Sequence, residues 1–384
     1  MVPLFVLAHC GHHLLTALPV PLLPMIRGDF GLDYTQSGFV ISAFMLSYGI
    51  GQLPAGLLAD RVGPRILMTT GILGVAVAGL LVGLSHTYLM MIAFLVLMGL
   101  LAGGYHPAAP PLISASVKPE NLGRALGLHV IGGGVSFFLA PIIAAWIAAT
   151  WGRRGSFIAL AVPAAVVGII LYLNLGQRGL AKKSRPKAAP SQKDKAADQD
   201  RTSTLAYFIF LATFTHAVLS STMSFIPLFM VDHFLVSKAT AAALIAVIYS
   251  AGLWVGPIGG YLSDRLGRVP VVLTVCFMTG PLIYLLNLAP YRWGIVALLL
   301  MMGITIYVRM PAAEAYIVGR TSERHRSTVL GIYFFGNMEG SGVFAPIMGY
   351  LIDHLGFSAS FTIAGATAVA VALVCSVLLT KGHD

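Results

Sequence analysis

Charged side chains are scarce in this chain. Its 384 residues include 24 Lys or Arg and 14 Asp or Glu, so that 10% are charged while 57% are hydrophobic. A soluble domain carries roughly 25% charged residues, and the mean hydropathy of this chain is +0.86. The composition therefore excludes an ordinary soluble enzyme and predicts a protein embedded in a lipid bilayer.

Cysteine is also rare, and the motifs of covalent and ATP-driven chemistry are missing. The three cysteines, Cys10, Cys276 and Cys375, lie far apart within apolar stretches, which argues against a disulfide framework or a zinc motif. No GxxxxGK[ST] loop occurs, so we expect a gradient rather than ATP to supply energy. With no nucleophile and base placed for catalysis, we predict that the chain is not an enzyme and has no cofactor and no metal site.

Positive charge is unevenly distributed along the chain. The formal net charge of +10 would by itself suit nucleic acid. If the apolar segments cross the membrane alternately from an inside N-terminus, however, most Lys and Arg fall in cytoplasmic loops. The exceptions are Arg27, Arg153, Arg154, Lys238 and Arg292 outside, and Arg309 within a span. This positive-inside pattern predicts a multi-pass inner (plasma) membrane protein with both termini cytoplasmic and no nucleic-acid partner.

Twelve apolar segments are long enough for transmembrane helices, since about 20 apolar residues cross the hydrocarbon core. The first lacks a basic leader and a cleavage site, so we expect it to be retained. Residues 177–203 are polar and Lys-rich, which predicts a flexible cytoplasmic linker between an N-terminal half (1–176) and a C-terminal half (204–384). The spans lie near 2–25, 35–59, 66–85, 88–115, 123–150, 155–176, 204–231, 239–263, 269–289, 293–318, 327–352 and 357–380.

The two halves repeat each other at a constant shift of 204 residues. GLLADRVG at 56–63 recurs as GYLSDRLG at 260–267, and the same shift maps His12 onto His216. Coincidences at one shift indicate a duplication, and duplicated halves form a pseudo-symmetric bundle with a binding site at the midplane. The predicted fold class is an all-α polytopic membrane protein with twelve transmembrane helices in two six-helix bundles.

The repeated segment resembles a known signature. GLLADRVGPR (56–65) is similar to the major facilitator superfamily motif between the second and third spans, and GYLSDRLGR (260–268) is similar to its weaker copy. The resemblance covers the whole chain and implies a carrier, which we expect to be monomeric, that moves a small-molecule substrate by alternating access. Alternatively, the motif residues only fix the topology. The cytoplasmic gate that the resemblance implies contains Gly56, Asp60, Arg61, Gly63, Arg65, Asp264, Arg265 and Gly267.

Further stretches suggest a subfamily. Ser136-x3-Ala140-Pro141-x2-Ala144-Ala145 resembles a degraded form of the motif of proton-coupled exporters, with Ala or Ser where that motif has Gly. The stretches LPVPLLPMIRGDFGLDYTQSGFVISAF and GGYHPAAPPLIS are similar to fosmidomycin-resistance-type efflux proteins. These resemblances imply export driven by protons.

Ionisable side chains within a membrane are expected to be functional, because burying their charge is costly. Counting 1.5 Å per residue, Arg309 lies roughly 15 Å and Glu339 roughly 20 Å from the cytoplasmic side. The two could form a structural ion pair. Alternatively, Arg309 could bind an anionic substrate group while Glu339 carries the coupling proton. We predict a secondary proton-coupling role for Glu314, beyond the helix break expected at Pro311.

Three histidines, His9, His12 and His13, fall on one face of the first span together with Thr16. Imidazole titrates near neutral pH, and we predict that His9 and His13 carry coupling protons. Any one of them could instead be a neutral, hydrogen-bonded core residue. Three imidazoles could also hold a transition metal, but no carboxylate or thiolate completes such a set.

Two more histidines belong to spans that we expect to line the cavity. His216 is the symmetry mate of His12, and His106 precedes a run of prolines that should kink the fourth span. Together with the permanent cation in the tenth span, they complete the predicted substrate-binding set. That set is Arg309, His106, His12 and His216.

The function that these features predict is proton-coupled export of a small anionic or amphipathic organic solute. The same residues would also serve a symporter or uniporter that imports an organic anion. A lysolipid flippase, a transition-metal carrier and a non-transporting sensor on the same fold are further alternatives. A flippase would need a lateral opening toward lipid, and a sensor would be expected to carry a folded soluble appendage.

Overall fold

The computed structural model describes residues 1–118, 121–177, 198–321 and 325–381. Within these ranges the chain forms helices and turns and contains no strand. The N-terminal half contains α1 (Val2–Thr16), α2 (Leu23–Phe30), α3 (Tyr34–Val62), α4 (Pro64–Leu84), α5 (Tyr88–Ala102), α6 (Tyr105–Ser116) and α7 (Leu122–Gln177). The C-terminal half contains α8 (Asp198–Phe234), α9 (Lys238–Ser250), the 3₁₀ turn η2 (Ala251–Leu253), α10 (Val255–Leu266), α11 (Arg268–Leu285), α12 (Trp293–Arg320) and α13 (Arg326–Lys381).

The helices supply the twelve predicted membrane crossings. Seven of the described helices are long and apolar enough to cross a membrane, the stretch Tyr88–Ser116 formed by α5 and α6 makes eight, and the bent pair α9–α10 makes nine. Helices α7 and α13 have 56 residues each and turn back at Gly152 (φ 63°) and Gly356 (φ 76°), so each crosses twice. A positive φ is readily adopted by glycine alone. The short apolar helix α1 is the remaining crossing, and the predicted fold class is confirmed.

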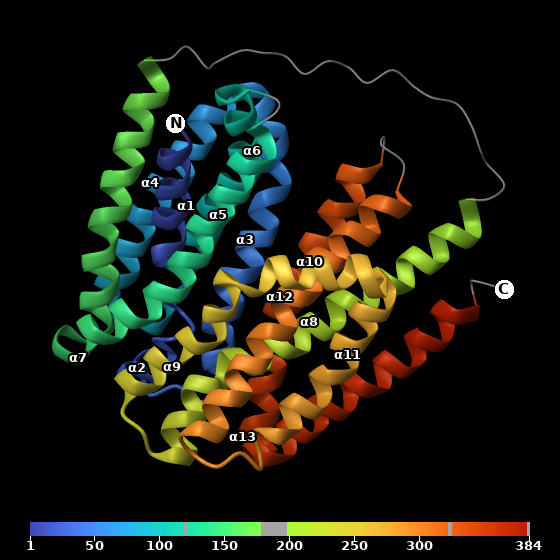
Figure 1. The fold of residues 1–384 in the computed structure, drawn as a ribbon. Coiled ribbons are helices and arrows are strands. Elements are labelled where there is room, and N and C mark those ends of the chain that lie inside the picture. Colours follow the sequence, from blue (N-terminus) through green and yellow to red (C-terminus); the bar gives the residue numbers. More distant parts are fainter. Residues whose placement is uncertain (119–120, 178–197, 322–324, 382–384) are drawn as a thin grey trace.

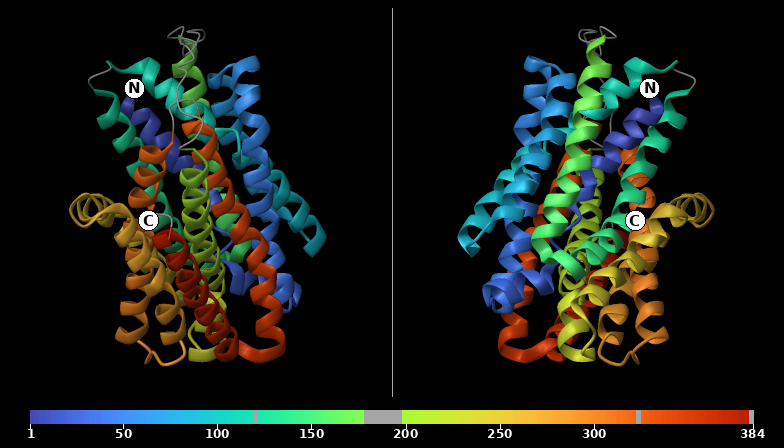
Figure 2. Two further views of the ribbon diagram at one scale, coloured as in Figure 1. Left: turned by 90° about the vertical axis from the view of Figure 1, so that its right-hand side faces the viewer. Right: turned by 90° about the vertical axis from the view of Figure 1, so that its left-hand side faces the viewer.

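Two of the predicted spans are broken. The fourth is divided into α5 and α6 at Gly103, whose carbonyl has no N–H partner four residues on because that residue is Pro107. The eighth bends by 47° between Lys238–Leu253 and Val255–Leu266, and α10 (yellow) stands away from the bundle in Figure 2. Helix α8 begins at Asp198, before the predicted start at 204, and most of the predicted linker lies outside the described residues.

Apolar packing differs between the two ends of the bundle. One core cluster joins both halves and includes Phe44 from α3 and Phe229 from α8. Two further clusters each stay within one half, one around Tyr105 and the other around Tyr316. Accordingly, Figure 1 shows the halves converging at the bottom and separating toward the top. We call the converging end, which carries Asp232, the Asp232 end, and the opposite end the Gly63 end.

The halves meet closely where α3 packs on α13. A Cβ atom added to Gly38 would lie 2.6 Å from the carbonyl oxygen of Ala345 and 2.7 Å from the Cα atom of Pro346. Gly349 of α13 is packed just as closely against the backbone of Tyr34. Such contacts require small residues, which let helix backbones approach in membranes. Helix α7 of the N-terminal half also packs against α9 of the C-terminal half.

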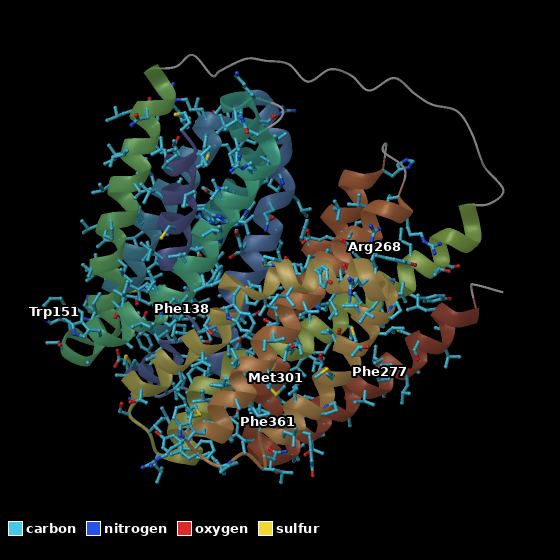
Figure 3. The ribbon with its side chains drawn as sticks, in the orientation of Figure 1. Phe138, Trp151, Arg268, Phe277, Met301 and Phe361 are labelled. Carbon is cyan, nitrogen blue, oxygen red and sulfur yellow. The ribbon has the colours of Figure 1, made fainter. Side chains whose placement is uncertain are left out.

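Aromatic side chains mark the outer surface near the Asp232 end. Trp151 at the bend of α7 is 65% exposed, and Figure 3 shows it pointing away from the bundle. Trp293 at the start of α12 is exposed too. Tryptophan is enriched where a membrane surface meets water, so this end suits one interface of the bilayer.

Candidate functional site

Charged residues join the halves at the Asp232 end. Arg27 of α2 donates from Nη1 to the Oδ2 atom of Asp232 at the end of α8, at 2.6 Å. The hydroxyl of Tyr34 donates to the same oxygen at 2.7 Å, and the Arg27 guanidinium lies 4.1 Å from the Tyr34 ring centroid. Charge-assisted hydrogen bonds of this kind are among the stronger ones.

A second carboxylate completes this closure. Asp353 of α13 accepts from the backbone N–H of Tyr34 at 2.9 Å and of Thr35 at 2.8 Å, and from the Thr35 hydroxyl at 2.6 Å. Tyr34 and Thr35 begin α3, and an anion is stabilised by the free N–H groups at a helix N-terminus. The sequence analysis did not single out Asp232 or Asp353, because each follows directly after a predicted span and its partner is far away in the chain.

The predicted gate residues lie at the Gly63 end, and the contacts of those side chains that the structure describes stay within one half. Arg65 donates to the carbonyl of Tyr172 at 3.0 Å and lies over its ring. Gly63 and Gly267 have φ values of 88° and 90°, which explains glycine at both copies of the motif. Gly56 and Asp60 both lie in α3, and the side chain of Asp60 is outside the described part of the structure. Arg61 and Asp264 are exposed, as is Arg265, which lies over the ring of Tyr261.

Helix α11 begins beside the second copy of the motif. Arg268, labelled in Figure 3, donates to the carbonyl of Ala315 in α12 at 2.8 Å. Both residues belong to the C-terminal half. Arg65 and Arg268, which end the two copies of the motif, therefore each bond to another helix of their own half. The two halves are joined to each other at the Asp232 end.

Histidines from three helices form one cluster inside the N-terminal half. Helix α1 supplies His9, His12 and His13, α6 supplies His106 and α7 supplies His129. The ring centroid of His9 lies 4.2 Å from that of His129 and 4.8 Å from that of His13. The ring centroid of His106 lies 5.4 Å from that of His9 and 5.5 Å from that of His13. The structure thus joins His106 to the face of α1 that the sequence predicted.

Two tyrosines that the sequence analysis did not assign to this cluster belong to it. Tyr105 stacks on His12 at 4.4 Å between centroids, and the hydroxyl of Tyr48 lies 3.4 Å from the Nε2 atom of His12. Helical periodicity could not reveal Tyr105, because the break at Gly103 sets the direction of α6. In the described part of the chain, the ring contacts of His12 are all with the N-terminal half, so none reaches its symmetry mate His216.

Arg309 of α12 is buried in the C-terminal half, with 5% of its surface exposed. Its Nη1 atom donates to the carbonyl of Ala212 at 2.7 Å and to the Tyr333 hydroxyl at 3.4 Å. The ion pair considered with Glu339 is not formed, and no described carboxylate lies within 4.0 Å of Arg309. Arg309 faces α8, and it interacts electrostatically with His216, Cys276 and Glu314.

Glu339 faces the other half instead. Its carboxylate lies directly against the α-carbon of Gly49 in α3, so that a side chain at Gly49 would collide with it. One oxygen of Glu339 is buried and has no hydrogen-bond partner in the described structure, and the same holds for one oxygen of Glu314. The two candidate proton-coupling acids therefore lie in different surroundings, one at the contact between the halves and one beside Arg309.

Arg153 is a buried cation whose importance the sequence analysis missed. It was expected in an outside loop, and it does lie at the bend after the first part of α7, but it is only 1% exposed. It pairs with Asp29 of α2 at 2.7 Å and lies over the ring of Phe30. This pair anchors α2 on its own half.

Two similar helical halves, joined at one end and carrying buried polar residues between hydrophobic helices, define the class of secondary transporters. The chain belongs to the Major Facilitator Superfamily, whose sequence profile matches residues 5–214 and again residues 204–383. It is accordingly a multi-pass inner-membrane transport protein of a family that is not enzymatic.

Relatives of known sequence agree with this placement. Multidrug resistance protein MdtG of Citrobacter koseri is 25% identical over 363 residues, covering 90% of this chain and 87% of the relative. The uncharacterized MFS-type transporter YceJ of Bacillus subtilis is 22% identical, covering 90% and 88%. A probable L-galactonate transporter of Escherichia coli is 29% identical over 148 residues, and here the match spans 38% of this chain and 33% of the relative.

Solved structures share the fold at low sequence identity. A bacterial homolog of the human lysosomal transporter Spinster, inward-facing and occupied, has a TM-score of 0.80 at 15% identity, covering 100% of this chain and 96% of the other. A POT family transporter in complex with 5-aminolevulinic acid has a TM-score of 0.83 at 12% identity, covering 99% and 96%.

Proposed function

We propose that this protein exports a small anionic or amphipathic organic solute in exchange for protons. The observation that carries the proposal is Arg309, a permanent cation that is 5% exposed and has no carboxylate within 4.0 Å among the described residues. Glu314 interacts with this charge without pairing directly with it, and a buried ion that lacks a direct partner costs several kcal/mol. An anionic group of the solute would supply this direct partner, and a guanidinium can hold a carboxylate or phosphonate in a bidentate manner.

Polar groups around Arg309 suit the remainder of such a solute. The Tyr333 hydroxyl is already within hydrogen-bond reach of Arg309, and His216 is partly exposed beside it with a buried Nδ1 atom that lacks a partner. From the N-terminal half, the partly exposed His106 would contact the solute. His12 is fully buried, so its predicted part in binding would be to support the neighbouring rings.

Glu339 is the proposed site of proton coupling. Its carboxylate belongs to the C-terminal half but lies on Gly49 of the N-terminal half. Binding a proton removes a charge from the contact between α3 and α13, and this changes the free energy of separating the halves. A carboxyl group that titrates at a moving interface couples proton binding to movement. Glu314, beside Arg309, would respond to the solute instead.

We propose that the Gly63 end faces the cytoplasm, as the distribution of Lys and Arg along the chain suggests. The conformation described above is then open toward the cytoplasm. To test this orientation, Leu235, which is 84% exposed at the Asp232 end, is replaced by Cys in a chain whose three native cysteines are Ala. A membrane-impermeant maleimide should label Leu235→Cys in intact cells. Labelling only after the membrane is broken would reverse the orientation.

Relatives give the direction of transport that we favour. MdtG is a multidrug resistance protein whose match covers most of both chains, which supports export. The second candidate is uptake of an organic anion, supported by the partial match to a probable L-galactonate transporter. Both candidates use Arg309 in the same way, and they differ in whether the solute moves outward or inward while the coupled proton moves inward.

Proteoliposomes test the substrate class and the coupling together. A panel of labelled organic anions and uncharged analogues of similar size is loaded, and flux is followed with and without an imposed pH gradient. We expect flux of anions only, driven by the gradient and lost in Arg309→Met, which keeps the side-chain length without the charge. Arg309→Lys should retain part of the flux, because a point charge replaces the planar donor. Equal flux of the uncharged analogues, or normal flux in Arg309→Met, would refute the proposal.

A further inference from the structure

Three histidines in the N-terminal half direct their ring nitrogens toward one another. His9 and His13 lie one turn apart on α1, and His106 lies at the start of α6, just after the break in the fourth span. One ligand atom from each lies within 4.8 Å of the others. His9 is 7% and His13 is 6% exposed, whereas His106 is partly exposed. The open side of the group is therefore the side of His106.

The surroundings of His9 fix which of its nitrogens carries the proton. Nδ1 lies 2.8 Å from the backbone carbonyl of His129. A carbonyl can only accept, so Nδ1–H is the donor and Nε2 carries a lone pair. That Nε2 atom is buried and has no hydrogen-bond partner among the described residues. A second ring nitrogen held by a backbone carbonyl is the arrangement that orients metal-ligating histidines.

His13 has a hydroxyl partner that is compatible with the same tautomer. Its Nδ1 atom lies 3.0 Å from the hydroxyl oxygen of Thr16. The Thr16 hydroxyl uses its own proton on the backbone carbonyl of His12, at 3.4 Å. When the hydroxyl donates there, its oxygen accepts from the Nδ1–H group of His13, and this tautomer leaves a lone pair on Nε2. In that tautomer His13 adds a second Nε2 lone pair beside the buried, unpartnered Nε2 atom of His9.

Ordinary packing does not account for this arrangement. A buried acceptor without a donor costs about 1–3 kcal/mol, and buried histidines normally bond through both nitrogens. A hydrogen-bond donor or a cation between the rings would satisfy the lone pairs. The group contains imidazoles and neither a carboxylate nor a thiolate, which disfavours Mg²⁺ and Ca²⁺ and suits Zn²⁺, Co²⁺, Ni²⁺ or Cu²⁺.

We infer that His9, His13 and His106 bind one divalent transition-metal ion of the zinc type inside the N-terminal half. Tetrahedral Zn²⁺ with nitrogen ligands at about 2.0–2.1 Å needs nitrogen atoms roughly 3.3 Å apart, so the rings close by side-chain rotation from their present spacing. The fourth position, on the side of the partly exposed His106, is left for water or hydroxide. This inference replaces both the expectation of no metal site and the proton-coupling role predicted for His9 and His13.

The ligands come from one half, and this has a consequence for the site. Movement of the halves against each other does not separate α1 from α6, so the ion stays bound throughout the transport cycle. Metal binding can therefore be measured without transport, and the inferred metal site does not depend on the proposed function being correct.

The test is metal titration of the purified full-length chain in detergent, after complete removal of any polyhistidine tag. Co²⁺ binding is followed by visible absorption, and Zn²⁺ affinity by competition with a chromophoric chelator. We expect one ion per chain and a tetrahedral Co²⁺ spectrum. His106→Gln should weaken Zn²⁺ binding at least about tenfold, and Thr16→Val, which removes the support of His13, should weaken it by a smaller factor.

Two control variants and one double variant make the result decisive. His233→Gln and His354→Gln change histidines outside the cluster and should leave the affinity unchanged. Because His106 is partly exposed, His106→Gln is expected to fold even if changes at His9 do not. Absence of stoichiometric binding, or full Zn²⁺ affinity retained in both His106→Gln and the double variant His9→Gln/His13→Gln, would overturn the site.

Discussion

Arg27 and Asp232 are 205 positions apart in the chain, and their side chains meet at 2.6 Å where the two halves converge. The Tyr34 hydroxyl donates to the same carboxylate oxygen. Asp232 therefore binds two groups of the opposite half and is the centre of the closure at this end. Its carboxylate must lose both partners whenever the halves separate there.

Replacing Asp232 should shift the balance between the two conformations. The side chains of Arg27 and Asp232 are 28% and 30% exposed, so their pair contributes about 1 kcal/mol. Asp232→Asn is thus expected to raise the population open at the Asp232 end about fivefold. The measurement is a distribution of distances between spin labels at Leu89 and Trp293, which are exposed at this end of the two halves.

Asp29→Asn is the matched control for that experiment. It makes the same chemical change at the same end, but the partner of Asp29 is Arg153 of its own half. The distance distribution should then resemble that of the unchanged chain. An equal shift in both variants would mean that general loss of negative charge, rather than the contact with Arg27, controls the closure.

Gly38→Ala should hinder closure more strongly. Its new methyl group would lie 2.6 Å from the carbonyl oxygen of Ala345, which belongs to a packed helix backbone and cannot move alone. Overpacking of this kind costs about 1–3 kcal/mol, so transport should slow by roughly tenfold. Gly127→Ala is the control, because nothing lies within 4 Å of the position that its Cβ would take. Normal transport by Gly38→Ala would show that this contact does not limit closure.

Arg153→Ala should destabilise the N-terminal half. The change removes the partner of Asp29 and the cation over Phe30 from a site that is 1% exposed. Asp29 can still be solvated, so we expect a loss of about 2 kcal/mol rather than the larger loss of a fully buried pair. The midpoint of unfolding in detergent measures it. Arg154→Ala, at the neighbouring exposed position, should lower the midpoint less than half as much.

Glu339→Gln should separate solute movement from proton movement. A glutamine keeps the shape of the side chain against Gly49 but cannot release a proton. We expect exchange of labelled for unlabelled solute to continue while the pH gradient no longer drives net flux. Glu314→Gln, beside Arg309, should instead change the affinity for the solute. Gradient-driven flux in Glu339→Gln would assign the coupling proton to another residue.

The sequence by itself determined the architecture. Twelve apolar segments and a constant shift between two halves require a polytopic helical bundle with internal symmetry, because an isolated backbone can satisfy its hydrogen bonds in lipid only as helices or closed barrels. Glycine at positions 63 and 267 was visible in the repeat, and positive φ angles explain it. These features are local or periodic, so they can be recognised without knowing which helices touch.

Tertiary structure decided which polar residues meet. The sequence placed Arg309 and Glu339 on neighbouring spans at similar depth, but helix rotation turns one toward Ala212 and the other toward Gly49. Rotation about a helix axis depends on packing against every neighbour, and the periodicity of a uniformly apolar span does not specify it.

The same limit applies to the histidine cluster and to the closure at the Asp232 end. Spacing of three and four residues placed three histidines on one face of α1, but only the break before α6 brings His106 to them. Nothing in the sequence links Arg27 to Asp232, since each is a single charged residue beside an apolar segment. Their contact depends on the relative position of the two halves, which changes during transport and which the order of residues alone does not fix.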